Sequence, residues 1–88
     1  MSPDGWAERA EQVAERVERA RFSPVRLVAG YDQGQVDDLL DQLVRAAKHG
    51  RGLRSLVESA RFDRTRLREG YAMGEVDAFL ADLAAYAP

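Results

Sequence analysis

The sequence predicts an all-α domain of four helices, built from two tandem helix-loop-helix repeats with a period of 40 residues. The main observation is internal similarity: residues 20–47 return as residues 60–87, with 13 identities in 28 positions. Apolar residues also recur at steps of three and four, and no segment alternates with a period of two for long enough to indicate a sheet. We place the first repeat at residues 1–49 and the second at residues 50–88, together forming one domain.

Each half of the first repeat has a helical pattern. A first helix is expected from about residue 4 to residue 20, with an apolar stripe formed by Trp6, Ala10, Val13, Val17 and Ala20. A second helix is expected after Asp32, which with Gln35 forms a capping-box pattern, and Gly50 stands where a C-terminal cap belongs. The stripe of this second helix consists of Val36, Leu39, Leu40, Leu43, Val44 and Ala47.

The second repeat follows the same plan with a weaker start to its last helix. A short third helix is indicated by Leu53, Leu56, Val57 and Ala60, and a fourth by Val76, Phe79, Leu80, Leu83 and Ala87. Because Ala72 replaces the capping aspartate, we expect the last helix to lose about 1 kcal/mol of stabilisation.

The loop between the helices of each repeat carries a Gly-Tyr pair, Gly30-Tyr31 and Gly70-Tyr71. We expect the glycine to supply a backbone conformation that a side chain would resist. The tyrosine is expected to pack on the valine five residues later as a hydrophobic staple. Three charged positions recur in both copies, Arg21 with Arg61, Arg26 with Arg66 and Asp37 with Asp77. We expect a loop arginine to bridge to the aspartate in the first turn of the following helix.

The chain is short for the core that it must build. It has 88 residues, of which 45 % are apolar, and 14 of its apolar residues are alanines. A chain of this size buries only about 60 to 65 % of its unfolded surface. We therefore expect a marginal core and apolar stripes that are incompletely covered, so that dimerisation or a larger scaffold protein completes the fold.

The repeated motif resembles the N-terminal domain of the DivIVA family, and in particular the short DivIVA-like units found in tandem in small actinobacterial proteins. The residues that carry the resemblance are Phe22, Arg26, Gly30, Tyr31, Asp32, Val36 and Asp37, then Phe62, Arg66, Gly70, Tyr71, Val76 and Asp77. The resemblance implies a cytoplasmic, non-enzymatic helical module of bacterial division or polar-growth scaffolds, which self-associates and recruits partners at curved membrane. Family members that bind membrane carry an aromatic residue and an arginine just before Gly-Tyr, where this chain has Val28-Ala29 and Arg68-Glu69, so we do not expect membrane insertion.

Charge is unevenly distributed along the chain, whose net charge is −2. Residues 45–68 sum to +6, because they hold eight basic and two acidic side chains. This basic block consists of Arg45, Lys48, Arg51, Arg54, Arg61, Arg64, Arg66 and Arg68. It is expected either to pair with the acidic segments on its two sides or to contact an acidic partner or an anionic membrane surface at the inner face of the membrane. Nucleic acid is less favoured, because no helix-turn-helix or stacking-aromatic pattern accompanies the arginines.

The sequence offers little for catalysis, and we expect neither a catalytic residue, a cofactor nor a metal. The one histidine, His49, is expected at a helix end. The carboxylates of Asp37, Asp38 and Asp41 are expected to form a solvated helix face, with a weak divalent-cation site as the alternative. The sequence thus favours a protein-interaction module, with binding of anionic lipid or nucleic acid by the basic block as the second hypothesis.

Overall fold

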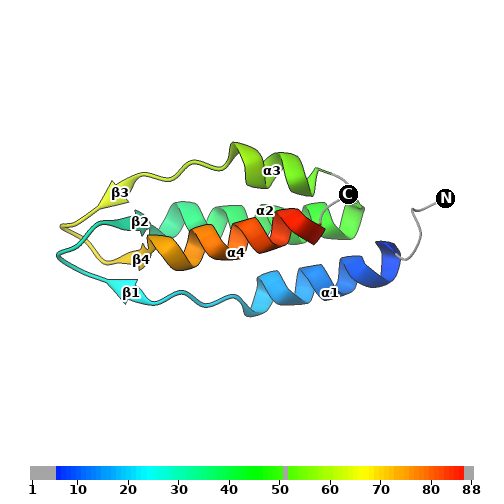
Figure 1. Cartoon of the computed structure of the whole chain (residues 1–88), viewed down its shortest axis with the longest axis horizontal. Helices are drawn as coiled ribbons and strands as arrows, with labels where there is room; N and C mark the ends of the chain where they lie inside the picture. Colours follow the sequence, from blue (N-terminus) through cyan, green and yellow to red (C-terminus); the bar gives the residue numbers. More distant parts are fainter. Residues whose placement is uncertain (1–5, 51, 87–88) are drawn as a thin grey trace.

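The structure, a computed structural model of the chain, describes residues 6–50 and 52–86, without the side chains of Trp6 and Ala7. In these ranges all of the expected helices are present, which confirms the helical prediction. The helices run along the long axis of a molecule that measures 48 Å in that direction (Figure 1). Their bounds are α1 Trp6–Arg19, α2 Gln33–His49, α3 Leu53–Ser59 and α4 Met73–Tyr86.

A small antiparallel sheet joins the two repeats, so the expectation of a purely helical chain was wrong. Its strands are β1 Pro24–Val25, β2 Gly30–Asp32, β3 Arg64–Thr65 and β4 Gly70–Ala72, in the order β1-β4-β2-β3. Each strand is only two or three residues long, which is too short to show an alternating pattern. Every pairing in the sheet joins one repeat to the other, across about 40 residues of sequence.

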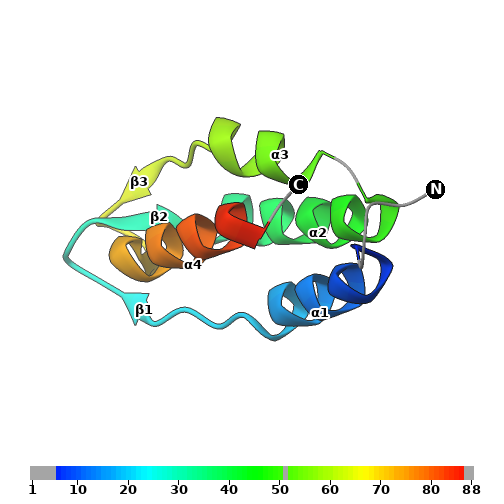
Figure 2. The same cartoon turned by 45° about the vertical axis from the view of Figure 1, so that its right-hand side comes forward.

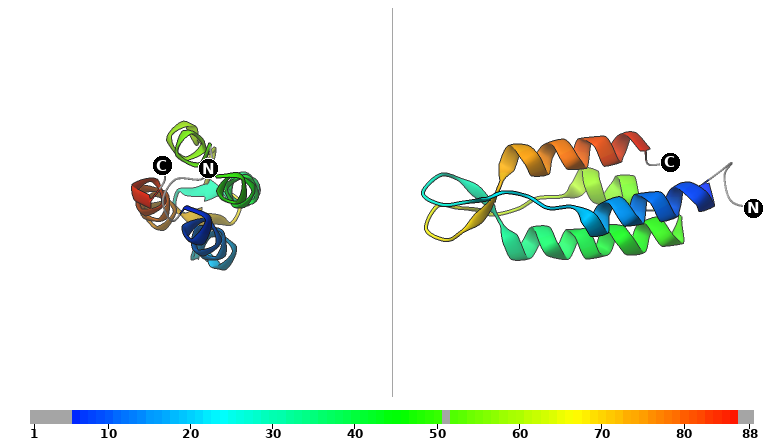
Figure 3. Two further views of the ribbon diagram at one scale, coloured as in Figure 1. Left: turned by 90° about the vertical axis from the view of Figure 1, so that its right-hand side faces the viewer. Right: turned by 90° about the horizontal axis from the view of Figure 1, so that it is seen from below.

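The register of the sheet relates the two repeats by an approximate twofold axis. Tyr31 lies opposite Tyr71 in the central pair of strands, and each is the equivalent of the other at an offset of 40 residues. The outer pairs are matched in the same way, since β1 lies against β4 as β3 lies against β2. The two loops therefore cross each other beyond the helices, as the right-hand view of Figure 3 shows. We call the central pair of strands, β2 and β4, the crossing.

The two strand glycines are required because two backbone segments approach each other closely at the crossing. A Cβ atom at Gly70 would lie 2.9 Å from the carbonyl oxygen of Tyr31 and 3.0 Å from the carbonyl carbon of Gly30. A Cβ atom at Gly30 would lie 2.7 Å from Cγ2 of Val25 and 3.1 Å from the oxygen of Tyr71. The positive-φ glycines among the described residues are Gly50 and Gly52 instead. Our expectation of a special backbone conformation at Gly30 was therefore wrong, and steric room is the reason for both strand glycines.

The core lies between the helices, where α1 packs on α2 and α3 packs on α4 (Figure 2). All of its buried residues are apolar: Ala10, Val13, Ala14, Val17, Val36, Leu39, Leu43, Ala47, Leu53, Val76, Leu80 and Leu83. Leu40 and Val44 of the expected α2 stripe are only half-buried. The stripe on α2 is thus incompletely covered within the chain.

The ends of α2 follow the predicted capping chemistry. Asp32 is the N-cap, and its Oδ1 accepts a hydrogen bond from the backbone N–H of Gln35 at 2.9 Å. Gly50 ends the helix in the left-handed region at φ 75°, and its N–H donates to the carbonyls of Ala46 and Ala47. This conformation suits glycine because it has no Cβ atom.

Candidate functional site

Two reciprocal hydrogen bonds connect the crossing to the helices. The hydroxyl of Tyr31 donates to Oδ1 of Asp77 at 2.8 Å. The hydroxyl of Tyr71 donates to Oδ1 of Asp37, also at 2.8 Å. The Asp77 bond, followed by partial burial, raises the pKa of Tyr31, while burial and then the Asp37 bond raise the pKa of Tyr71. Each repeat therefore fixes the first turn of the other repeat's long helix.

This arrangement replaces the arginine bridges that we expected. Asp37 and Asp77 are bound by tyrosines of the opposite repeat. Arg26 instead contacts Glu69, with Nε 3.5 Å from Oε2. The prediction of a loop arginine bridging to the aspartate of its own repeat was wrong because it assumed contacts within one repeat, whereas the loops cross and face the other repeat.

A second reciprocal pair of contacts surrounds the helix starts. The side chain of Gln35 donates to Oδ2 of Asp63 at 3.0 Å and accepts from the Asp63 N–H at 2.6 Å. In the equivalent place, the N–H of Ser23 donates to Glu75 at 2.6 Å, and its hydroxyl donates at 2.9 Å. These bonds lower the pKa of Glu75.

The capping box was therefore only half correct. The N-cap bond at Asp32 forms, but the Gln35 side chain reaches the other repeat rather than returning to Asp32. The Asp32 N–H is bound instead by the carbonyl of Asp63 at 2.9 Å, and the Ala72 N–H by the carbonyl of Ser23 at 2.9 Å.

The aromatic residues of the motif also pair across the repeats. The rings of Tyr31 and Phe62 lie 5.0 Å apart between centroids, and those of Phe22 and Tyr71 lie 5.5 Å apart. Phe22 additionally contacts Phe79, at 5.6 Å in an edge-to-face arrangement. These rings are half-buried against the core, which fits the expected structural role of the motif.

The two loop tips, in contrast, project from one end of the molecule (Figure 1). The first tip consists of residues 26–29 and the second of residues 66–69. At the tips Leu27 is 85 % exposed, Leu67 is 98 % exposed and Val28 is 55 % exposed. Leu27 also has a positive φ of 64°, which is rare and strained for a residue with a bulky side chain. Sequence reasoning missed these leucines as surface residues, although the repeated Arg-Leu pairs at 26–27 and 66–67 were visible.

The predicted basic block does not form one patch. The last turn of α2, which carries Lys48, lies at the end of the helix away from the loops (Figure 1). Arg61 is used at the end of α3, where its Nη1 donates to the carbonyls of Glu58 and Ala60. Arg51 lies outside the described residues. The other members are exposed and distributed over α2, α3, β3 and the second tip: Arg45, Arg54, Arg64, Arg66 and Arg68.

A more local basic feature surrounds the tips. Residues 24–29 and 64–69 together contain four arginines and one glutamate. Two of these arginines form ion pairs across the repeats, Arg26 with Glu69 and Arg68 with the half-buried Asp32, the latter at 3.1 Å. The exposed Arg26–Glu69 pair contributes little to stability.

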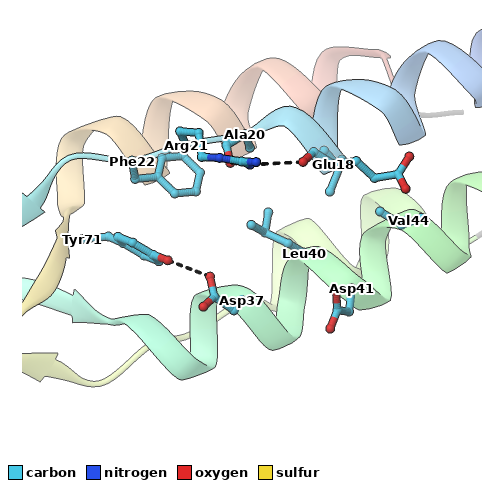
Figure 4. Close-up of a pocket in the computed structure, with 10 residues that line it drawn as sticks. Glu18, Ala20, Arg21, Phe22, Asp37, Leu40, Asp41, Val44 and Tyr71 are labelled. Atoms are coloured by element: carbon cyan, nitrogen blue, oxygen red, sulfur yellow. Dashed lines mark hydrogen bonds between the residues drawn. The ribbon is translucent and has the colours of Figure 1, made fainter.

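Each repeat also has an open groove beside its Phe-Tyr pair. The larger groove, of about 520 Å³, lies between α1 and α2 (Figure 4), and we call it the α1–α2 groove. Its residues are Val17, Glu18, Ala20, Arg21, Phe22, Asp37, Leu40, Asp41, Val44 and Tyr71. The equivalent groove of the second repeat, of about 360 Å³, is lined by Tyr31, Val57, Ala60, Arg61, Phe62, Arg64, Asp77 and Leu80.

The chemistry of these surfaces is that of binding by apolar and charged contacts. Among residues 6–50 and 52–86, no three His, Asp or Glu side chains come close enough together to hold a metal ion. In the same ranges, no helix has both the length and the apolar character needed to cross a membrane. Comparison with known proteins gave no matching family model, curated protein or solved structure.

Proposed function

We propose that this chain is a non-enzymatic protein-interaction module, a small adaptor that associates with copies of itself and with a larger scaffold of the kind used in bacterial division or polar growth. The observation that supports it best is the pair of exposed leucines, Leu27 and Leu67. Leu67 is almost fully exposed and Leu27 largely so, and both belong to the loops that project from one end of the molecule (Figure 1). An exposed apolar patch with a polar or charged rim is typical of an association surface.

The incomplete cover of α2 supports the same function. Leu40 and Val44 pack against the core but also line an open groove. The chain thus has an apolar tip and an apolar groove at separate places, and both would be covered on association. The link to division or polar growth rests on the resemblance of the repeated Gly-Tyr motif to the DivIVA N-terminal domain.

Sedimentation velocity over a range of concentrations tests this function. We expect the wild-type chain to sediment faster as its concentration rises through the micromolar range. The double variant Leu27→Ser with Leu67→Ser should remain a monomer while keeping its helical circular dichroism and its melting temperature. A wild-type chain that stays monomeric at every concentration would overturn self-association.

The second candidate function is contact with an anionic membrane surface. The specific observation that favours it is that both exposed leucines directly follow arginines, Arg26 and Arg66. Each basic group near an anionic leaflet contributes about 1 kcal/mol, and the leucines add apolar contact. This surface differs from the basic block expected from the sequence, because its leucines and Arg26 were not part of that block.

Flotation with vesicles distinguishes the two candidates. Binding to phosphatidylglycerol vesicles but not to phosphatidylcholine vesicles would support the membrane function, and added salt should weaken it. Loss of that binding in Arg66→Glu, but not in Arg45→Glu, would place the contact at the tip. Absence of flotation with both lipids would remove the membrane candidate, and a salt-sensitive shift of DNA on a gel would instead indicate nucleic-acid binding.

A further inference from the structure

The α1–α2 groove has an aromatic floor and an acidic rim. Phe22 faces the groove from the segment between α1 and β1, Tyr71 from β4 and Leu40 from α2 (Figure 4). The rim carries the carboxylates of Asp37 and Asp41, and both residues are exposed. A groove of this composition accommodates an apolar side chain on its floor and a cation at its rim.

The one cation in the lining does not neutralise this rim. Arg21 is turned toward the end of α1, where its Nη1 donates to the carbonyl oxygens of Glu18 at 3.2 Å and Ala20 at 2.7 Å. With Glu18 included, the lining holds three carboxylates and one guanidinium, a net charge of −2. The groove therefore has an excess of negative charge that its own lining does not balance.

The equivalent groove of the second repeat has diverged. Asp41 is replaced there by Ala81 at an offset of 40 residues, and Arg64 joins the lining. With Arg61 and Asp77, that groove carries two cations and one carboxylate, a net charge of +1. The two equivalent grooves thus have net charges of opposite sign, and only the first groove attracts a cationic segment.

The chain itself presents a segment of matching chemistry. At the second tip, Leu67 is 98 % exposed and is flanked by Arg66 and Arg68. The tip points away from the helices, so it does not reach the groove of its own chain (Figure 1). The second tip of another copy can supply a cation for the acidic rim of the groove and an apolar side chain for its floor.

We propose that the second tip of one copy docks in the α1–α2 groove of another, with Leu67 on the aromatic floor and Arg66 against Asp41. This inference rests on the proposed self-association and specifies its contacts. Because tip and groove are different surfaces of one chain, the contact either pairs two copies reciprocally, with a tip in a groove on both sides, or repeats head to tail along a series of copies.

Charge reversal tests this contact in the full-length chain. Asp41→Lys and Arg66→Glu should each weaken self-association about tenfold or more, because each places like charges in contact. The double variant should recover affinity to within about threefold of wild type if the two side chains are partners. Asp82→Lys and Arg45→Glu make the same charge changes at exposed positions outside the groove and the tip, so they should associate as wild type does.

Mixing the two single variants gives a sharper result. The intact tip of Asp41→Lys meets the intact groove of Arg66→Glu, and the two altered side chains also have opposite charges, so the mixture should associate as wild type does although neither variant does so alone. Failure of the double variant to recover, or wild-type association by either single variant, would overturn the tip-in-groove contact while self-association stands. A monomeric wild-type chain would instead overturn the proposed function itself.

Discussion

The crossing and the tips are only a few residues apart in sequence, yet they differ in how their side chains are used. At the crossing, a Cβ atom added to Gly70 would meet backbone atoms at 2.9 to 3.1 Å. Three residues earlier, Leu67 is 98 % exposed. The tyrosines at the crossing are bound by aspartates of the other repeat, whereas the tip leucines are largely exposed. The crossing therefore holds the fold together, and the tips are free for association.

The largest effect is expected where the two strands are in closest contact. Gly70→Ala should destabilise the protein by about 1 to 3 kcal/mol, because the atoms that must move belong to the backbone of the other repeat. Gly74→Ala is the matched control, since a Cβ atom there meets nothing within 4 Å and alanine favours a helix. Urea denaturation measures both, and equal stability of the two variants would contradict the close crossing.

A smaller loss is expected from the tyrosine hydroxyls. Tyr31→Phe and Tyr71→Phe should each cost about 1 kcal/mol at neutral pH, because each removes a hydrogen bond to a carboxylate. The raised pKa values of Tyr31 and Tyr71 also make the stability of the protein depend on pH. Above the ordinary tyrosine pKa of 10.0, the unfolded chain loses its phenol protons first, so stability falls as pH rises. The double phenylalanine variant should show a shallower fall, and an unchanged slope would argue against these bonds.

At acid pH the Ser23–Glu75 contact provides a third test. The pKa of Glu75 is lowered from 4.5, so its contribution is present above that value and is lost as pH falls through the lower folded-state value. Glu75→Gln should be less stable than wild type at neutral pH, and the difference should vanish once Glu75 is protonated. Thermal melts across this pH range measure the difference, and a pH-independent difference would contradict the assignment.

The smallest effect is expected at the tips. Leu27→Gly should change stability by no more than about 0.5 kcal/mol, with a gain favoured because glycine tolerates φ 64° and relieves the strained leucine. Leu67→Gly is the control, because the positive-φ non-glycine residues include Leu27 alone in the part of the chain that the structure describes. A loss of several kcal/mol at either tip would show that the leucines hold the fold after all.

The sequence predicted what depends on local patterns. The helix periodicity, the Asp32 cap and the Gly50 cap are each set by residues within one or two turns, and all were found. The sheet was missed because its strands form only by pairing with residues far away in the sequence, such as Tyr31 with Tyr71. For the same reason the predicted partners of Asp37 and Gln35 were wrong, because both side chains form hydrogen bonds with the opposite repeat.

The candidate surfaces were less predictable than the fold. The basic residues from Arg45 to Arg68 fall in one stretch of the sequence, but the structure distributes them over α2, α3, β3 and the second tip. Leu27 and Leu67 were visible as repeated residues, but nothing local distinguishes an exposed leucine from a core leucine. Their exposure follows from the loops crossing and projecting beyond the helices (Figure 3).

Amide hydrogen exchange at low and high protein concentration tests the distinction between crossing and tips most directly. Amides of β2 and β4 should be protected equally at both concentrations, because the crossing forms within one chain. Amides at residues 66 and 67 should exchange freely in dilute solution and become protected at high concentration, when copies associate. Protection of β2 and β4 only at high concentration, or tips that exchange equally fast at both, would contradict the account.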